Sequence, residues 1–261
     1  DDLLIYRYED RFMLVVNASN LEKDLKWLMD HKPDTVTIDN KSVEIGLIAL
    51  QGPRSRDILQ DVINEDLNDV SFYTFIEHNG MTIARTGYTG ELGFEIYGDH
   101  NFINEVWDAI MDTGQVEPCG LGCRDTLRME MKYCLYGNDI DETTNPIEAG
   151  LGWITKLGGD NFIGKEMAIQ AKQEKIRHLA AFEMVDRAVP RKGYLIYADG
   201  KEVGEVTSGT QSPSLQKGIG LGYVQFGKHK PGMDIEIDIR GKMKKAVIIK
   251  PPFYKQGSAQ S

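Results

Sequence analysis

The periodicity of apolar residues changes near residue 176, and this change constrains the fold more than any other feature of the sequence. Up to about residue 135, spacings of two and of three or four residues alternate irregularly, which favours an α+β sheet layer. Residues 176–252 instead hold short alternating runs separated by Gly, Pro and Asp, as is typical of a small all-β barrel. A polar helical connector lies between them. The sequence therefore predicts two domains, residues 1–165 and residues 176–255.

Individual elements of the first domain can also be predicted. Alternating runs on both sides of a short polar turn indicate a β-hairpin over residues 3–17, and leucines at helical spacing indicate a helix over 21–31. Two strands are expected around the Asp39-Asn40 pair. Residues 85–95, RTGYTGELGFE, predict a strand, a tight glycine corner and a second strand. At the other end of the chain, the composition of QGSAQS indicates a loose tail.

Charge and cysteine content exclude several classes of protein. The net charge is −10, and residues 1–125 alone hold 24 acidic and 10 basic side chains. Such a chain is a poor candidate for nucleic-acid binding, which depends on neutralising phosphates. No apolar run approaches the ~18 residues that a membrane-spanning helix needs. Three cysteines are too few for a disulfide framework and favour a reducing compartment.

The glycine-rich stretch 85–95 has two interpretations. The glycines either serve turns that require positive φ, or they admit a flat ligand beside Tyr88. Strand alternation puts Glu95 on the same face as Gly93 and Tyr97. A carboxylate at that position either belongs to the solvated surface or accepts two N–H donors from an aminopyrimidine edge.

A second glycine-rich segment, CGLGCRDTLR, precedes a predicted helix. It begins like a dinucleotide-binding fingerprint, but Asp125 replaces the third glycine, so we reject that interpretation. Cys119 and Cys123 lack a His or Cys partner nearby, so no metal site is expected. The helix N-terminus and Arg124 are instead suited to an anion or a carbonyl-rich ring, although an ordinary amphipathic helix explains the pattern equally well.

The remaining candidates are carboxylates and tyrosines. The scattered histidines form no Ser-His-Asp or zinc-protease pattern, which disfavours nucleophilic and metal-dependent hydrolysis. Asp1 and Asp2 lie where a strand begins, where acidic residues are commonly only solvated. A site made of carboxylates, an arginine and tyrosines is suited to positioning a reactive cofactor that brings its own nucleophile.

Several segments, taken in order, resemble the glycine cleavage T-protein (aminomethyltransferase) family. They are DDLLIYR, LVVNASNLEKD, ALQGP, RTGYTGELGFEIY, PCGLGCRDTLRMEMKYCLYGNDID, NPIEAGLGW, GEVTSGTQSPSL and PPFYK. The resemblance extends from residue 1 to about residue 255. Its RTGYTGE and GLGxRDTLR blocks are specific to this family and its folate-dependent relatives.

The resemblance implies a fold and a reaction. The expected fold is a three-lobed cloverleaf with a central tetrahydrofolate site, its first lobe incomplete here, closed by the C-terminal β-barrel. The expected reaction transfers an aminomethyl group from the lipoyl arm of H-protein to tetrahydrofolate, with release of ammonia and formation of 5,10-methylenetetrahydrofolate. Tetrahydrofolate is then a co-substrate and lipoylated H-protein a partner, with no metal, nucleic acid or membrane involved. The compartment would be the bacterial cytoplasm or the mitochondrial matrix.

The resemblance also assigns site residues. The family's catalytic aspartate corresponds to Asp2, which an ordinary pKa of about 3.9 would leave ionised at neutral pH. The Asp2 carboxylate would orient the folate nitrogens and stabilise the positive charge that develops as ammonia leaves. The folate contacts correspond to Val15, Asn17, Tyr88, Glu95, Arg124, Tyr133 and Tyr254, with Arg124 and Tyr133 on the helix.

One departure and two alternatives accompany this assignment. Family members carry a substantial segment before the DDL motif, and we expect that it is missing from this sequence. The first alternative is a folate-binding protein of the iron–sulfur cluster assembly type, without transferase activity. Such proteins carry a K-G-C-Y-type motif, whose glycine and Cys-Tyr step are missing from residues 132–136. The second is a module of a folate-linked demethylating dehydrogenase, although no flavin fingerprint is present.

Overall fold

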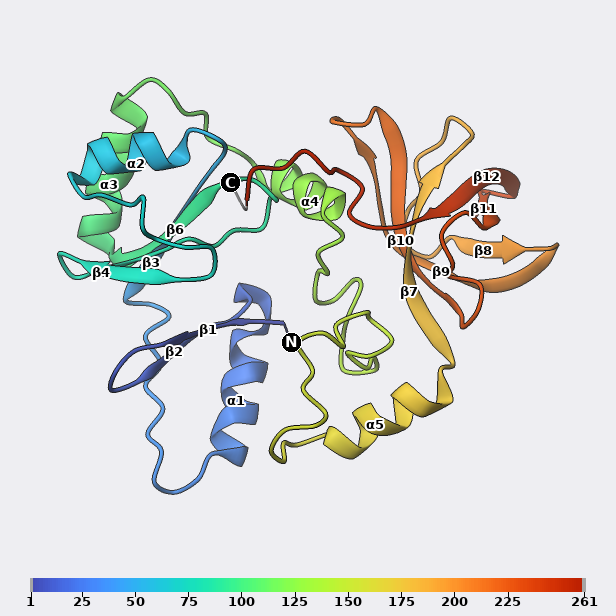
Figure 1. Cartoon of the computed structure of the whole chain (residues 1–261), viewed down its shortest axis with the longest axis horizontal. Helices are drawn as coiled ribbons and strands as arrows, with labels where there is room; N and C mark the ends of the chain where they lie inside the picture. Colours follow the sequence, from blue (N-terminus) through green and yellow to red (C-terminus); the bar gives the residue numbers. More distant parts are fainter. Residues whose placement is uncertain (1, 260–261) are drawn as a thin grey trace. The chain divides into compact units, whose positions relative to one another are not determined.

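The computed structural model describes residues 2–259, and the chain divides into two compact units. The barrel unit comprises Asp1–Asp30 and Met129–Tyr254, and the sheet unit comprises His31–Arg128 and Lys255–Ser261. Segments distant in sequence therefore share a unit: the N-terminal hairpin belongs with the C-terminal barrel, and the last residues belong with the sheet. Figure 1 labels the elements of both units.

The sheet unit is built on an antiparallel sheet with the strand order β3-β6-β5-β4. Two helices pack against β3 and β6 and against each other, on the same side of the sheet in Figure 1. The apolar core lies between the helices and the sheet, where Phe94 and Ile96 of β6 are completely buried. The strands and helices are β3 (Ile45–Gln51), β4 (Phe75–His78), β5 (Met81–Ala84), β6 (Gly93–Asp99), α2 (Ser55–Ile63) and α3 (His100–Asp112).

The last helix of this part of the chain is α4 (Leu121–Glu130), which runs from the sheet unit into the barrel unit. It starts directly after Gly120, as the glycine-rich segment predicted. It ends before Tyr133, because Lys132 has a φ of +63°, outside the helical region. The prediction that Tyr133 lies on the helix is therefore wrong.

The barrel unit combines the N-terminal elements with a closed barrel in the order β10-β7-β12-β11-β8-β9. Its N-terminal elements are β1 (Leu4–Arg7), β2 (Phe12–Val15), the 3-10 helix η1 (Ala18–Asn20) and α1 (Leu21–His31). The connector forms α5 (Lys165–Glu174). The barrel strands are β7 (Arg177–Met184), β8 (Leu195–Ala198), β9 (Lys201–Ser212), β10 (Lys217–Gln225), β11 (Asp234–Ile239) and β12 (Lys242–Ile249).

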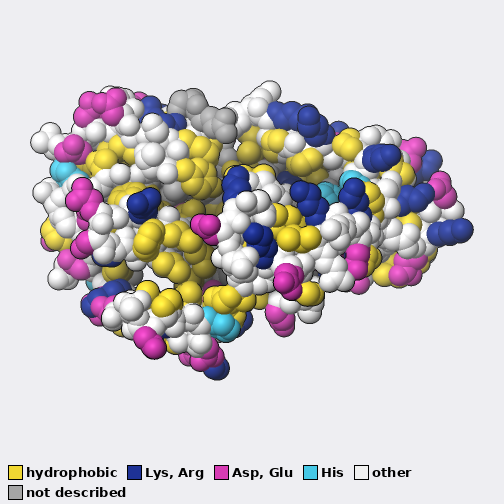
Figure 2. Space-filling model, turned by 60° about the horizontal axis from the view of Figure 1, so that its bottom comes forward, with side chains coloured by type: hydrophobic (Ala, Val, Ile, Leu, Met, Phe, Trp, Pro, Cys, Tyr) yellow, Lys and Arg dark blue, Asp and Glu magenta, His cyan; other side chains and the backbone are white. Residues whose placement is uncertain are grey.

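Glycines in the barrel strands lie where an added side chain would meet neighbouring groups. Gly204 of β9 lies beside β10, where an added Cβ would come within 1.8 Å of the carbonyl oxygen of Tyr223. Gly220 of β10 faces the ring of Phe182, and a Cβ added to Gly220 would lie 2.3 Å from a ring atom. Apolar side chains fill the interior around Phe182, which is completely buried. At the surface, apolar side chains are interspersed with charged ones on the face drawn in Figure 2, as is usual for folded proteins.

Most predicted elements are confirmed. The chain is α+β with a C-terminal barrel, the hairpin pairs Leu4 with Val15, and α1 spans the predicted residues. The cloverleaf arrangement of the lobes and the domain bounds 1–165 and 176–255 stay predictions. No helix within residues 2–259 combines the length and the apolar character needed to cross a membrane.

Two predicted strands are wrong. Residues 36–38 form no strand, and β3 remains the edge of its sheet. The predicted strand at the start of RTGYTGE is also absent: β5 ends at Ala84, and residues 85–92 form a loop. Gln51 explains this, since its Nε2 donates to the carbonyl oxygens of Thr86 (3.2 Å) and Phe94 (3.3 Å). The amide thereby takes the place of ladder hydrogen bonds between the two segments.

The close approach at Gly204 predicts a strong effect of a single methyl group. We expect Gly204→Ala to lower the free energy of unfolding by more than about 2 kcal/mol, because backbone atoms on β10 have to move. Gly158→Ala is the matched control, since its added Cβ has no neighbour within 4 Å and Gly158 does not need a positive φ. Urea unfolding of both variants measures the difference, and equal stabilities would contradict the packing described.

Candidate active site

The β1–β2 hairpin brings Asp2 and Asn17 together. Asp2 precedes β1 and Asn17 follows β2, and the register pairs Leu4 with Val15 between them. The Asn17 side-chain amide donates to the backbone carbonyl of Asp2 at 3.5 Å. Val15, Asn17 and Asp2 are all half-buried. The hairpin thus places three of the predicted site residues at its open end.

The environment of Asp2 disfavours its charge. Burial raises the pKa of Asp2 to about 6, and the nearby Asp139 carboxylate acts in the same direction, whereas a hydrogen bond from Asn17 opposes the rise. The expectation of an ordinary pKa near 3.9 was therefore wrong. Asp2 is nevertheless mainly a carboxylate at pH 7, and it is an anion with incomplete solvation.

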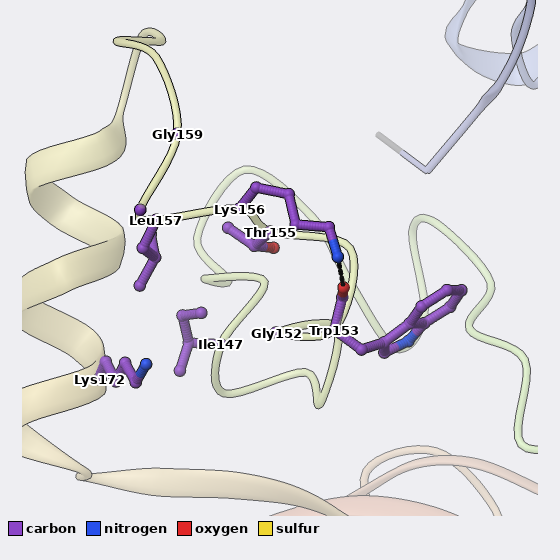
Figure 3. Close-up of a pocket in the computed structure, with 9 residues that line it drawn as sticks. Ile147, Gly152, Trp153, Thr155, Lys156, Leu157, Gly159 and Lys172 are labelled. Carbon is purple, nitrogen blue, oxygen red and sulfur yellow. Dashed lines mark hydrogen bonds between the residues drawn. The ribbon is translucent and has the colours of Figure 1, made fainter.

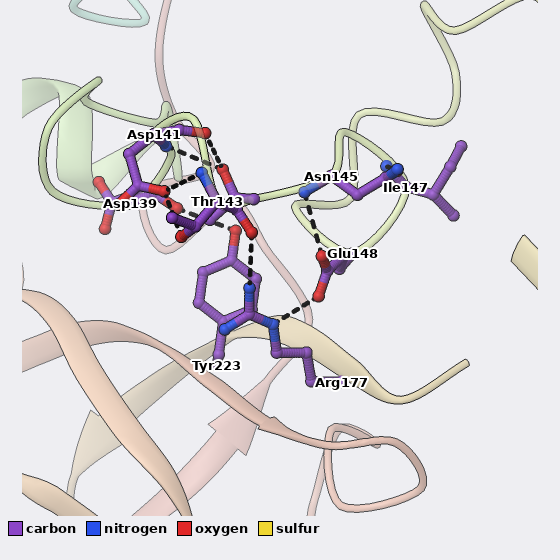
Figure 4. Close-up of polar contacts among 9 residues, drawn as sticks. Asp139, Asp141, Thr143, Asn145, Ile147, Glu148, Arg177 and Tyr223 are labelled. Carbon is purple, nitrogen blue, oxygen red and sulfur yellow. Dashed lines mark hydrogen bonds and ion pairs between the residues drawn. The ribbon is translucent and has the colours of Figure 1, made fainter. Parts of the chain in front are cut away.

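Asp139 is an anchor that the sequence did not reveal. It is completely buried, and its carboxylate accepts hydrogen bonds from the Leu135 amide (3.0 Å) and the Thr207 hydroxyl (2.5 Å). Its backbone carbonyl accepts from the Tyr223 hydroxyl at 2.9 Å, a contact drawn in Figure 4. These bonds join the segment after α4 to strands β9 and β10 of the barrel.

A second polar cluster holds the same segment against the start of β7 (Figure 4). Arg177 donates from Nε to Glu148 (2.5 Å) and from its guanidinium to the Thr143 carbonyl (3.4 Å). Asp141 accepts from the amide and hydroxyl of Thr143, and these bonds lower the pKa of Asp141. The hydrogen bonds fix residues 135–148 relative to the barrel without requiring regular secondary structure.

Tyr133 and Tyr254 lie near a common anchor, Glu130. The amide of Tyr254 donates to the Glu130 carbonyl at 3.0 Å, and Tyr133 follows Glu130 by three residues. The buried Glu130 carboxylate accepts from the hydroxyls of Ser212 (2.5 Å) and Ser214 (2.8 Å). Both tyrosines are half-buried. Glu130 therefore joins the end of α4, the barrel and Tyr254. The sequence offered no pattern that predicted this role.

Glu95 lies within the sheet unit, and it is not a surface residue. Its side chain is 6% exposed, and Oε2 accepts from the hydroxyls of Thr86 (2.5 Å) and Tyr97 (3.3 Å). The contact with Tyr97 confirms that these two residues share a face of β6. A carboxylate has about four acceptor positions, and both of these bonds use the same oxygen. Acceptor capacity therefore remains on Oε1.

Tyr88 and Arg124 contact each other. The Arg124 guanidinium carbon lies 4.7 Å from the centre of the Tyr88 ring, within the range of a cation–π interaction. Tyr88 belongs to the loop 85–92 and is half-buried, whereas Arg124 is exposed on the first half of α4. The structure thus brings together two side chains that the sequence assigned to the same ligand from separate motifs.

Two of the loop glycines have a role that neither interpretation of the sequence included. A Cβ on Gly87 or Gly93 would come within 2.0 or 2.2 Å of the Gln51 side-chain oxygen. Both glycines therefore make room for Gln51 rather than for a ligand. Among the glycines of this loop and its flanks, positive φ occurs at Gly90, at +77°. The hydroxyl of Thr89 donates to Gln51 at 3.2 Å, so Gln51 holds the loop at several points.

The predicted site residues fall into two groups. Tyr88, Glu95 and Arg124 belong to the sheet unit, and the others, namely Asp2, Val15, Asn17, Tyr133 and Tyr254, belong to the barrel unit. All members of each group belong to the same compact unit. Their assignment to folate binding and catalysis stays a prediction.

A pocket of about 590 Å³ in the barrel unit lies away from these residues in the chain. Figure 3 shows it between the loop at residues 152–159, Ile147 and Lys172 of α5. The Lys156 ammonium group donates to the carbonyl of Trp153 at 2.9 Å along its edge. None of the predicted site residues lines this pocket. Within residues 2–259, no group of three or more His, Cys, Asp or Glu side chains is placed to hold a metal ion.

The raised pKa predicts that Asp2 reduces stability at neutral pH. The pKa of about 6 in the folded state exceeds the reference value of 3.8, so stability falls as pH rises through this window. Asp2→Asn is therefore expected to increase the free energy of unfolding by about 1–3 kcal/mol above pH 7, with the gain vanishing below pH 4. Asp10→Asn, at the exposed hairpin turn, is the control. Urea titrations at several pH values measure this, and a pH-independent difference would refute it.

Comparisons with known proteins agree with the sequence motifs. The family model described as the GCVT N-terminal domain matches residues 1–159, and the model of the glycine cleavage T-protein C-terminal barrel domain matches residues 177–255. An aminomethyltransferase from Bacteroides fragilis is 47% identical over 267 residues, covering 98% of this chain and 74% of the relative. One from Halothermothrix orenii is 45% identical, covering 97% and 73%.

A solved structure also matches. It is the glycine cleavage system aminomethyltransferase T from Bartonella henselae, with a TM-score of 0.91 and 31% identity, covering 99% of this chain and 73% of that chain. Fold, family models and relatives agree along nearly the whole sequence. The chain therefore belongs to the glycine cleavage T-protein family, whose relatives named here are aminomethyltransferases.

Proposed function

We propose that this protein transfers the aminomethyl group on the lipoyl arm of H-protein to tetrahydrofolate. The products are 5,10-methylenetetrahydrofolate, ammonia and the dihydrolipoyl arm. Family membership supports this reaction, with bacterial relatives named as aminomethyltransferases. The reaction would take place in the bacterial cytoplasm or, in a eukaryote, in the mitochondrial matrix.

The observation that carries the mechanism is the incompletely solvated carboxylate of Asp2. Tetrahydrofolate supplies the nucleophilic nitrogen, so the protein needs no activated Ser or Cys. Asp2 provides a fixed negative charge that stabilises the ammonium character of the departing nitrogen. Because burial raises the pKa of Asp2, this charge is less screened than that of a surface carboxylate. Asn17 orients the segment that carries it.

Glu95 is suited to the polar edge of the pterin ring. An aminopyrimidine presents adjacent N–H donors, and a carboxylate with acceptor capacity left on one oxygen matches them. The hydroxyls of Thr86 and Tyr97 fix the Glu95 side chain from the opposite oxygen. Glu95 therefore supplies orientation and affinity, whereas the charge on Asp2 acts on the reacting nitrogen.

The aromatic residues and Arg124 complete the proposed folate site. The Arg124 guanidinium lies over the ring of Tyr88, so these two side chains together offer a surface on the sheet unit for a flat ring. The family motifs also assign Tyr133, Tyr254 and Val15 to folate. Aromatic rings are suited to this role because they bury large flat areas with little loss of side-chain entropy.

Substitution of Asp2 distinguishes catalysis from binding. We expect Asp2→Asn to reduce the turnover number at least 100-fold, while the dissociation constant of tetrahydrofolate changes less than about threefold. Ammonia release from aminomethylated H-protein measures turnover, and calorimetry measures binding. Asp10→Asn should match the native protein in both assays. Equal loss of binding and turnover would contradict the assigned role, and folate binding by the native polypeptide without ammonia release would indicate a non-transferase folate protein.

The pH dependence of turnover provides a separate test. Because Asp2 acts as the carboxylate, the turnover number should rise with pH and level off above the pKa of about 6. The residual turnover of Asp2→Asn should lack this limb. A native profile that is flat between pH 5 and pH 7 would show that the ionisation of Asp2 does not control the reaction.

A further inference from the structure

The C-terminal residues are bonded to the loop that carries Tyr88. The backbone amide and hydroxyl of Ser258 donate to the Glu91 carboxylate at 3.1 and 2.5 Å, and the Leu92 amide donates to the Ser258 hydroxyl at 2.9 Å. The Ala259 amide donates to the carbonyl of Gly90 at 3.2 Å. The prediction of a loose tail is therefore wrong for residues 257–259, whereas residues 260 and 261 lie outside the described part of the chain.

Further contacts fix this arrangement from both sides. The Ala259 carbonyl accepts from the Arg85 guanidinium at 3.3 Å, at the start of the loop. Gly257 packs against the loop so closely that an added Cβ would lie 2.3 Å from the Gly90 carbonyl oxygen. The C-terminal segment 257–259 thus contacts the loop at its first residue, at Gly90 and at its last two residues.

Gln51, the last residue of β3, holds the same loop through a separate set of hydrogen bonds. Gln51 bonds the carbonyl of Thr86 and the hydroxyl of Thr89, and that hydroxyl also accepts from the Glu91 amide at 3.2 Å. Glu91 therefore connects the two anchors. Its amide donates to the Thr89 hydroxyl, which donates to Gln51, and its carboxylate accepts from Ser258. Tyr88 lies between the residues that these anchors hold.

We propose that Ser258 and Glu91 are positioning residues, which hold the loop 85–92 so that Tyr88 presents its ring to folate. The folate part of this proposal rests on the proposed function. Both residues would act through the loop and not on the reacting atoms. Fixing the loop before binding removes the entropic cost of ordering it at binding, so the effect should appear in folate affinity rather than in the chemical step.

Kinetics test the positioning role. Ser258→Ala should raise the KM for tetrahydrofolate about three- to tenfold, while kcat and the KM for aminomethylated H-protein stay within about twofold. Ser258→Thr keeps the hydroxyl and should restore the native KM. Gln256→Ala is the matched control, because Gln256 is an exposed neighbour with no described bond to the loop. An unchanged folate KM in Ser258→Ala, or equal effects on both substrates, would overturn the proposal.

Hydrogen exchange tests, without folate, whether the C-terminal segment 257–259 holds the loop 85–92. The Leu92 amide should exchange at least about tenfold faster in Ser258→Ala than in the native protein, with amides of the barrel strands unaffected. Gly257→Ala should give the same result through steric displacement of the segment. Unchanged exchange in both variants would refute the claim that segment 257–259 holds the loop, even if folate binding is intact. Faster exchange in the variants, together with a native protein that does not bind folate, would refute the proposed function. The conclusion that segment 257–259 holds the loop would remain valid.

Discussion

The sheet unit depends on a carboxylate buried in the middle of a strand. Glu95 is 6% exposed on the face of β6 opposite Phe94 and Ile96, so its charge is tolerated only with hydrogen bonds. Thr86 supplies the shorter of these bonds, and Thr86 is held in turn by Gln51 through its carbonyl. The irregular loop 85–92 is therefore a consequence of satisfying polar groups within a sheet. The same loop carries Tyr88, which links this constraint to the proposed folate site.

The barrel unit uses buried carboxylates in the same way. Glu130 and Asp139 are 1% and 0% exposed, and each carboxylate accepts hydrogen bonds from barrel residues. Asp139 also accepts from the Leu135 amide in the irregular segment after α4. Removing either partner would leave a buried charge uncompensated, which costs more than the bond itself. These anchors fix Tyr133 and Tyr254 in a region without regular secondary structure. At Asp2, burial raises the pKa, and part of the stability is lost to keep this side chain charged.

Periodicity predicted the elements whose side chains pack locally. The hairpin at residues 3–17, helix α1 and the barrel follow directly from alternation and helical spacing. Periodicity failed at residues 36–38, which form no strand. It also failed at residues 85–92, where the outcome depends on Gln51, more than 30 residues away from its acceptors. Alternation also placed Glu95 and Tyr97 on one face. It did not predict Thr86, Glu130, Asp139 or Ser258, whose partners lie on distant elements.

The most direct test of this account is the affinity of tetrahydrofolate for Glu95→Gln, measured by calorimetry beside the native protein. Glutamine has the same shape and retains an acceptor for Thr86 and Tyr97, but it removes the charge proposed to bind the pterin edge. A charge-assisted hydrogen bond contributes about 1.5–3 kcal/mol, so the account predicts a dissociation constant at least about tenfold higher with native thermal stability. A dissociation constant within about twofold of the native value would contradict the central role of Glu95.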